Sequence, residues 1–206
     1  MRRTRGSIFV VAVLAAGVLA PAAVGGEAAL AAGGPAGPVF RLFAGTDLPN
    51  QLVTGPDGAV WFTNDGSDSI GRVTPSGGFR TFTGPGIDSP NTITVGPDGA
   101  MWFTNYTPGT PAPGTIGRIS TKGTVTVFPS RKINGPFGIT SGPDGALWFT
   151  NYNGNTIGRI TTSGVVTTYA TPFTLSLIQF IAPGPAGTLW FTGLTDVIGE
   201  ISGIKT

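Results

Sequence analysis

Hydrophobic residues along this chain fall in short runs of four to six, separated by turns rich in Gly, Pro, Asn and Asp. The runs are rich in β-branched and aromatic residues, which is typical of β-strands. One stretch reads Trp61-Phe62-Thr63-Asn64, then Ile70-Gly71-Arg72-Val73, then Phe79 to Phe82. No window has the period of an amphipathic helix. The pattern predicts an all-β fold.

These strands belong to a repeat. The motif Gly-Pro-Asp-Gly-Ala-x-Trp-Phe-Thr-Asn begins three times almost unchanged and returns once in altered form, at Gly55, Gly96, Gly142 and Gly184. Its tryptophans are 41, 46 and 42 residues apart, at Trp61, Trp102, Trp148 and Trp190. This spacing is the period of a four-stranded propeller blade. We predict a β-propeller domain over residues 39–206, with blade repeats near 50–82, 91–128, 137–169 and 179–201.

The repeated residues have structural interpretations. Pro-Asp-Gly suits a tight turn, so Asp57, Asp98 and Asp144 are predicted to be turn formers rather than catalytic carboxylates. A tryptophan at the same strand position in every blade fills the space between adjacent sheets, so we expect core residues rather than a stacking platform. The recurrent strand arginines are expected to be solvated or to lie between blades, with Arg159 near Glu200.

Closure of the ring has two alternatives. Residues 39–43 resemble the outermost strand of a blade, and the last unit ends after its third strand, Val197 to Ile201, which gives sixteen strands in all. Pairing of these two segments would complete a closed ring of four blades and remove its exposed edges. The other alternative is that the four blades form half of a larger ring, which two chains complete as a homodimer.

The N-terminus has the features of a secretory signal peptide over residues 1–31. A basic start, Met1 to Arg5, precedes an apolar run from Ile8 to Ala20, and Ala29-Leu30-Ala31 suits signal peptidase. The apolar run is too short for a confident membrane anchor. Residues 32–38 are predicted to be a flexible Gly/Pro/Ala linker. We therefore expect an extracytoplasmic protein, secreted or in the cell envelope.

Charge narrows the class of partner. The first 31 residues contain three arginines and one glutamate, so removing them takes twelve basic residues to nine and ten acidic residues to nine. The mature protein is then neutral, and it carries no basic stripe for a phosphate backbone. Nucleic acid is not an expected partner. The chain has no cysteine, which excludes disulfides and lipidation through a thiol.

The run from Gly142 to Asn151, followed by Asn155 to Thr161, resembles the blade repeat of the virginiamycin B lyase family. The resemblance covers about residues 39 to 201. It implies a seven-bladed propeller that opens cyclic streptogramin B antibiotics by elimination across an ester bond, a route to antibiotic resistance. It also implies Mg²⁺ held on one face by Glu and His side chains.

This sequence departs from the family at both working positions. The position of the family's His holds Asn50, Asn91, Phe137 and Gln179. The position of its Glu, directly after Trp-Phe-Thr, holds Asn64, Asn105, Asn151 and Gly193. The chain has no His, and carboxamides cannot abstract a proton near neutral pH. We therefore predict no catalytic residue, no metal ligand and no cofactor, with Mg²⁺ needed only if the lyase activity persists.

The same positions predict a ring of amides around one mouth of the central channel. Its members are Asn50, Asn64, Asn91, Asn105, Asn151 and Gln179. Amides offer neutral donors and acceptors together, which suits an uncharged polar small molecule, a glycan or a peptide. The alternative is that Asn simply fits the conformation of these loops. A Pro-rich insertion, Tyr106 to Gly114, is expected to overhang the same face.

Two functions from different classes remain. The first is a secreted propeller that binds an uncharged ligand or partner without turning it over. The second is a divergent, Mg²⁺-dependent carbon–oxygen lyase. The absence of the family's base and metal ligands favours the first.

Overall fold

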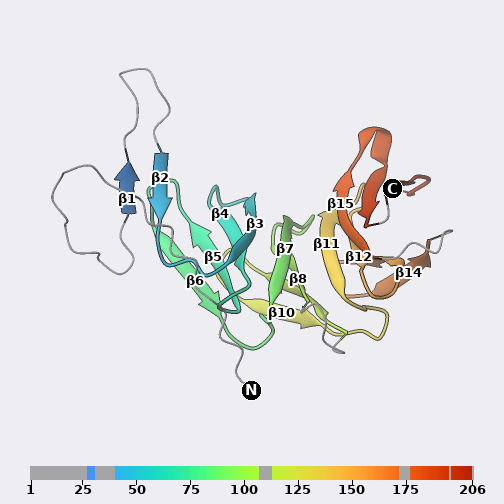
Figure 1. Cartoon of the computed structure of the whole chain (residues 1–206), viewed down its shortest axis with the longest axis horizontal. Helices are drawn as coiled ribbons and strands as arrows, with labels where there is room; N and C mark the ends of the chain where they lie inside the picture. Colours follow the sequence, from blue (N-terminus) through green and yellow to red (C-terminus); the bar gives the residue numbers. More distant parts are fainter. Residues whose placement is uncertain (1–26, 31–39, 107–112, 172–176, 195, 206) are drawn as a thin grey trace.

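The computed structural model describes residues 27–30, 40–106, 113–171, 177–194 and 196–205, and these form an arc of small antiparallel sheets (Figure 1).

We call the four main sheets blades 1 to 4. Blade 1 contains β3 (Pro49–Thr54), β4 (Val60–Asn64), β5 (Ser69–Val73) and β6 (Phe79–Thr83). Blade 2 contains β7 (Pro90–Val95), β8 (Met101–Asn105), β9 (Thr115–Ile119) and β10 (Val125–Phe128). Blade 3 contains β11 (Pro136–Ser141), β12 (Leu147–Asn151), β13 (Thr156–Ile160) and β14 (Val166–Ala170). Blade 4 contains β15 (Ile178–Pro183), a 3₁₀ turn (Pro185–Gly187), β16 (Leu189–Gly193) and β17 (Val197–Ile201).

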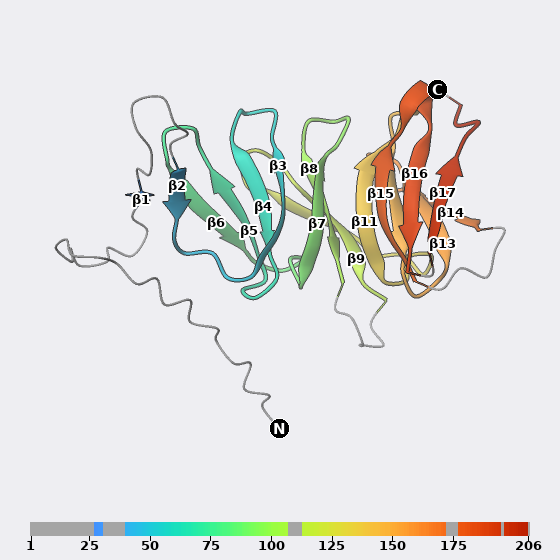
Figure 2. The same ribbon diagram turned by 45° about the horizontal axis from the view of Figure 1, so that its top comes forward.

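The blades stack side by side through their faces, as the repeat predicts. The first strands of successive blades, β3, β7, β11 and β15, are neighbours, and the later strands of each blade follow outwards (Figure 2). The all-β propeller architecture predicted from the sequence is confirmed. Among the described residues no helix is long and apolar enough to cross a membrane.

The core lies between the blades in three clusters, one at each junction. Trp61 and Trp102 are fully buried, and Trp148 is 5% exposed. Each tryptophan stacks on an aromatic ring from the fourth strand of its own blade, such as Trp61 on Phe82 with ring centres 5.3 Å apart. The prediction that the tryptophans fill the core is confirmed for these three blades. Burial of one such side chain stabilises the array by about 2 to 3 kcal/mol.

The repeated Asp lies in the turn between the first and second strands of its blade, as predicted, and it holds a small network. In blade 1, Asp57 Oδ1 accepts hydrogen bonds from the backbone N–H of Ala59 and from Trp61 Nε1, while Oδ2 accepts one from Arg72 Nε at 2.8 Å. Blades 2 and 3 repeat it with Asp98 and Asp144.

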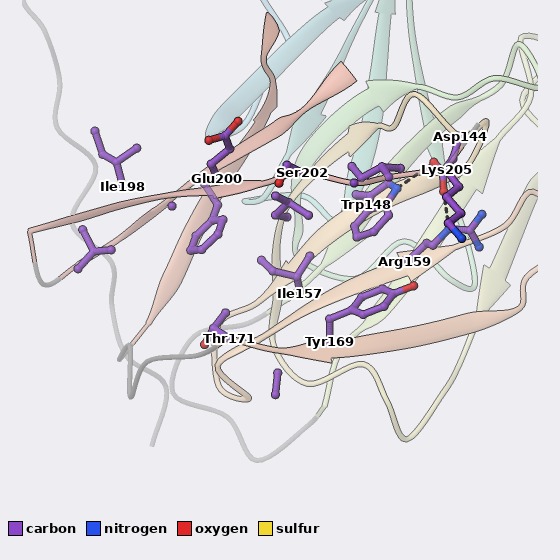
Figure 3. A pocket seen from close by; sticks show the side chains of 17 residues that line it. Asp144, Trp148, Ile157, Arg159, Tyr169, Thr171, Ile198, Glu200, Ser202 and Lys205 are labelled. Carbon is purple, nitrogen blue, oxygen red and sulfur yellow. Dashed lines mark hydrogen bonds and ion pairs between the residues drawn. The ribbon is translucent and has the colours of Figure 1, made fainter. Parts of the chain in front are cut away.

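Arg159 and Glu200, which we expected to lie near each other, line the same cavity but form no ion pair with each other (Figure 3). Arg159 Nε instead lies 2.6 Å from Asp144 Oδ2, within its own blade. The reason is local, because the turn carboxylate of each of blades 1 to 3 lies beside the third-strand arginine of that blade. Blade 4 has Ala186 and Glu200 at these two positions, so it has neither member of the pair.

The predicted pairing of residues 39–43 with Val197 to Ile201 is not formed. Strand β2 (Phe40–Phe43) pairs instead with β1 (Glu27–Leu30), at the end of the arc opposite β17 (Figure 2). Strand β1 lies within the segment assigned to the signal peptide, and it brings the strands among the described residues to seventeen instead of sixteen. The apolar clusters join successive blades, and the four blades span an open arc whose two ends lie apart (Figure 2). The rest of residues 1–31 and the linker 32–38 lie outside the described part of the chain.

Candidate functional site

The strand register brings the two predicted sets of amide positions to one edge of the blades. The first residue of each first strand pairs with the last residue of the second strand, as Pro49 with Asn64 and Pro90 with Asn105. The second residue of each first strand belongs to the other set, at positions 50, 91, 137 and 179. Both sets therefore lie along the same edge of the blades, where the sequence analysis expects the mouth of a channel.

Asn50 and Asn91 contact each other across the junction between blades 1 and 2. Asn50 Nδ2 donates to Asn91 Oδ1 at 2.5 Å. Asn50 is exposed, whereas Asn91 is 8% exposed. Nearby, Gln51 Oε1 accepts a hydrogen bond from the backbone N–H of Ile93 at 2.7 Å. The pair couples two blades and leaves the amide of Asn50 facing solvent.

The asparagines after Trp-Phe-Thr have a different environment. Asn105 Nδ2 donates to Gly86 O and Thr115 Oγ1, and its Oδ1 accepts from the backbone N–H of Asp88. Asn151 makes the equivalent three bonds in blade 3. Both side chains are buried, at 4% and 1% exposure. These amides tie the loop before the first strand to the second and third strands. Their contacts therefore agree with the alternative in which Asn serves the loop.

Asn64 departs from this pattern in blade 1. It is fully buried, and its Nδ2 donates to Ser69 Oγ at 3.1 Å. Within the described residues its Oδ1 has no hydrogen-bond partner. Blades 2 and 3 anchor the loop before the first strand with a buried isoleucine, Ile87 or Ile133, where blade 1 has the exposed Thr46. The loop of blade 1 therefore lacks the anchor that brings a backbone N–H to this oxygen.

An aromatic cluster beside the amides was missed by the sequence analysis. Phe137, at the position of the family's His, stacks on Tyr152 with ring centres 5.7 Å apart and meets Phe180 edge-on at 5.3 Å. Tyr106 packs against both Phe137 and Tyr152. A tyrosine follows Trp-Phe-Thr-Asn in units two and three, and this repetition was the available signal. Phe180 is 52% exposed, so the cluster extends to the surface next to Gln179.

The described side chains at this edge of the blades are poorly suited to proton transfer near neutral pH. Burial raises the pKa of Tyr106, and its hydroxyl donates to Asn153 Oδ1 at 3.0 Å, so the phenol stays protonated near neutral pH. Asp68 Oδ1 accepts the backbone N–H of Ser89 at 2.7 Å, which assigns that carboxylate to a loop. The half-buried Gln179 accepts a bond from Thr150 Oγ1 through its backbone oxygen.

The donor set does not fit the Mg²⁺ that the resemblance implies. The positions of the metal ligands hold amides and Phe137 in place of carboxylates and imidazoles, and Phe137 offers no ligand atom. The side-chain oxygens of Asn91, Asn105 and Asn151 already accept hydrogen bonds from the chain. Throughout the described part of the chain, no three acidic, His or Cys side chains gather into a metal-binding group. Mg²⁺ prefers several oxygen ligands including carboxylates, so we derive no step through it.

The Pro-rich insertion lies mostly outside the described residues, which omit 107–112. Its last part joins blade 3, because Pro113 O accepts the backbone N–H of Gly135 at 2.7 Å.

Comparison with solved structures supports the fold and the relationship. A streptogramin B lyase is 33% identical, with a TM-score of 0.69 over 82% of this chain and 60% of that one. Virginiamycin B lyase from Staphylococcus aureus is 35% identical, with a TM-score of 0.69 over 84% of this chain and 62% of that one. A catalytically inactive variant of the S. aureus enzyme with quinupristin is 36% identical, with the same TM-score over 81% and 60% of the two chains. This chain therefore spans about three fifths of the length of these lyases.

No curated protein sequence matches this chain significantly. The model of the Virginiamycin B lyase family matches residues 39–204, which is most of the chain. On this match, and on identities of 33–36% to solved lyases, the chain belongs to the virginiamycin B lyase family.

Proposed function

We propose that this protein binds an uncharged polar ligand, a peptide or a glycan, at the mouth lined by Asn50, Asn91, Gln179, Phe137 and Phe180, and does not turn it over. The observation that carries the proposal is that Phe137 and three neutral amides, Asn50, Asn91 and Gln179, occupy the family's proton-transfer position, with an aromatic cluster around Phe137.

The chemistry of the mouth selects the ligand class. Aromatic faces favour the apolar face of a sugar ring or the side chains and backbone of a compact peptide. The Asn50 amide supplies a donor and an acceptor without charge. The amides of Asn105 and Asn151 already form hydrogen bonds within the protein and hold the loops. We therefore assign the contacts with the ligand to the exposed residues.

Lyase activity is the second candidate, favoured by membership of the family. Ester elimination needs a base to remove a proton and a group that stabilises the developing negative charge. The described mouth offers a protonated tyrosine and neutral amides for these roles, which places this candidate second.

Incubation with a streptogramin B antibiotic and Mg²⁺, followed by mass spectrometry of the antibiotic, separates the candidates. We expect the antibiotic to keep its mass. Ring-opened product that forms faster than in buffer, and that disappears with a chelator, would reverse the order of the two functions.

Binding is tested with neutral oligosaccharides, cell-wall glycopeptides and the intact antibiotic, by calorimetry. Asn91→Ala, which also removes the support of Asn50, should weaken any hit by about 1 to 2 kcal/mol. Asp98→Asn is the control, because Asp98 lies in a turn at the opposite edge of blade 2. If Asp98→Asn abolished binding and Asn91→Ala left it intact, the ligand would bind at the opposite edge of the blades and the proposed site would be wrong.

We also propose that residues 1–31 direct export, so that the protein works outside the cytoplasm. Its N-terminal sequence, determined on protein recovered from the envelope and medium of an expressing bacterium, should begin near residue 32. An intact N-terminus on protein confined to the cytoplasm would contradict export.

A further inference from the structure

The residues at the proposed binding positions stand on β-bulges, one in the first strand of each blade. In blade 1 the register shifts between Pro49 and Leu52, so two residues of the first strand, 50 and 51, oppose the single residue Thr63. Blades 2 to 4 repeat the shift opposite Thr104, Thr150 and Thr192. The first bulged residue is a binding position in every blade, namely Asn50, Asn91, Phe137 and Gln179. A bulge interrupts the ladder of backbone hydrogen bonds and redirects a side chain.

A threonine hydroxyl replaces the interrupted ladder at the bulge of blade 1. The backbone N–H of Gln51 donates to Thr63 Oγ1 at 3.1 Å. The Thr63 hydroxyl in turn donates to the backbone oxygen of Asn91 in blade 2 at 2.9 Å, whereas its alternative acceptor, Gln51 O, lies at 3.4 Å. A hydroxyl has one proton and two lone pairs, so it accepts from its own blade and donates to the next at the same time. Thr63 is fully buried, so water does not compete for these bonds.

The junction between blades 2 and 3 repeats both bonds. The N–H of Thr92 donates to Thr104 Oγ1 at 3.1 Å, and Thr104 Oγ1 donates to Phe137 O at 2.9 Å. Thr104 is also fully buried. The hydroxyl of Thr92 donates to the same carbonyl at 2.6 Å, so two donors hold the peptide group after Phe137.

The junction between blades 3 and 4 repeats them again. The N–H of Gly138 donates to Thr150 Oγ1 at 2.8 Å, and Thr150 Oγ1 donates to Gln179 O at 2.6 Å. In blade 4 the N–H of Phe180 donates to Thr192 Oγ1 at 3.3 Å. The same pair of bonds therefore crosses all three junctions between the described blades.

These bonds join into one continuous belt. The carbonyl of a binding-position residue and the N–H of the residue after it belong to the same peptide group. Each such group in blades 2 to 4 accepts from the threonine of the preceding blade and donates to the threonine of its own blade. The belt runs from the peptide group after Asn50 to Thr192, and every bond in it points the same way. Hydrogen bonds in such a chain polarise and strengthen one another.

We propose that the buried threonines of this belt are positioning residues for the binding site, each of which sets the orientation of the binding-position residue in the next blade. The pairs are Thr63 with Asn91, Thr104 with Phe137, and Thr150 with Gln179. Valine has nearly the shape of threonine but can neither accept nor donate, so the belt accounts for a threonine at this buried position. The role in binding rests on the proposed function, whereas the belt is present in the protein without a ligand.

The test uses the full chain without a ligand, so a failed ligand screen would leave its result unaffected. Thr150→Val removes the hydroxyl and keeps the shape of the side chain. We expect hydrogen exchange of the Gly138 N–H to become about tenfold faster, because that group loses its partner. The NMR signals of the Gln179 side-chain amide and of the Phe180 N–H should also move, although both groups lie in the next blade. Thr150→Ser restores the hydroxyl and should return these signals to their parent positions.

Thr168→Val is the matched control. It makes the same substitution in the outer strand β14 of the same blade, away from the belt, and it should leave the signals of Gln179 and Phe180 unchanged. Signals that stay in place in Thr150→Val would overturn the proposal, because the threonine would then support only its own blade. Equal movement in Thr150→Val and Thr150→Ser would also overturn it, since the shape of the side chain and not its hydroxyl would be responsible.

A second variant keeps the test decisive if Thr150→Val does not fold. Thr63→Val breaks the belt between blades 1 and 2, where exchange of the Gln51 N–H should become faster and the Thr92 N–H signal should move. Thr63→Ser should reverse both effects. A Thr92 signal that stays at its parent position in Thr63→Val would contradict positioning across the junction.

Discussion

At the residue scale, one network recurs in blades 1 to 3 and couples a turn to the core. The turn Asp accepts a hydrogen bond from the core Trp and an ion pair from the strand Arg, whose guanidinium in blade 1 lies 5.6 Å from the Trp61 ring centre. Burial of these carboxyls works toward a higher pKa. The bonds from Trp and Arg outweigh it, so the pKa values of Asp57, Asp98 and Asp144 lie below the ordinary 3.8.

These lowered pKa values predict an acid-sensitive fold. Because the unfolded chain binds protons at a higher pH than the folded one, the contribution is fully present above the ordinary pKa and is lost as pH falls through the folded values. Denaturant unfolding from about pH 6 to about pH 2 should show stability falling below about pH 4, where the aspartates of the unfolded chain take up protons. The triple variant with Asn at all three positions should be less stable near neutral pH and lose less on acidification. An equal loss in parent and variant would exclude these carboxylates as the cause.

Asn105 gives a second prediction at this scale. Its amide makes three hydrogen bonds to loop and strand and is 4% exposed. Asn105→Ala should lower the free energy of unfolding by about 1 to 3 kcal/mol, because buried backbone groups lose their partners. Calorimetric melting measures it. Unchanged melting with loss of ligand binding would assign this side chain to the ligand instead of the loop.

At the scale of the element, the third strand of every blade must have a glycine. A side-chain carbon on Gly71, Gly117, Gly158 or Gly199 would overlap the phenylalanine ring of the second strand, as at Gly117 and Phe103. Ile-Gly therefore repeats because the Phe of Trp-Phe-Thr lies across the neighbouring backbone.

Gly117→Ala should accordingly destabilise the fold by about 1 to 3 kcal/mol, through overpacking against a buried ring. Gly154→Ala is the control, because the nearest atoms to its added carbon lie at 3.5 Å, an ordinary contact distance. Urea denaturation of both variants measures the difference. Equal stabilities would show that the rings have room to move.

At the scale of the whole molecule, stability should be uneven along the arc. Blades 2 and 3 are covered on both faces, whereas blades 1 and 4 each leave one face uncovered. In a stacked array each unit depends on its neighbours, so the ends open first.

Trp102→Ala should therefore lower the free energy of unfolding by about 3 to 5 kcal/mol, and Trp190→Ala by clearly less. Hydrogen exchange should show faster exchange in β16 and β17 than in β8 and β12. Equal costs for the two substitutions would mean that Trp190 is covered in solution.

The sequence predicted the blades and their tryptophans because each repeat carries its own strands, turn and core residues in one short segment. It also predicted which positions share one edge of the blades, since antiparallel register follows from the turns. The different environments of these amides were not predictable from the sequence. Asn50 and Asn105 are the same residue type, but Asn50 faces solvent and Asn105 is held by a loop nineteen residues away. The cluster of Tyr106, Phe137 and Tyr152 was likewise missed, because it joins side chains from two blades.

Sequence alone determined the all-β class, the repeat and the family resemblance, because local chemistry within about 40 residues specifies a blade. Tertiary structure alone decided that β2 lies at the opposite end of the arc from β17, and that Arg159 pairs with Asp144 rather than Glu200. These outcomes depend on the angle at which blades stack and on contacts between distant segments. A pattern of residue types along the chain contains neither.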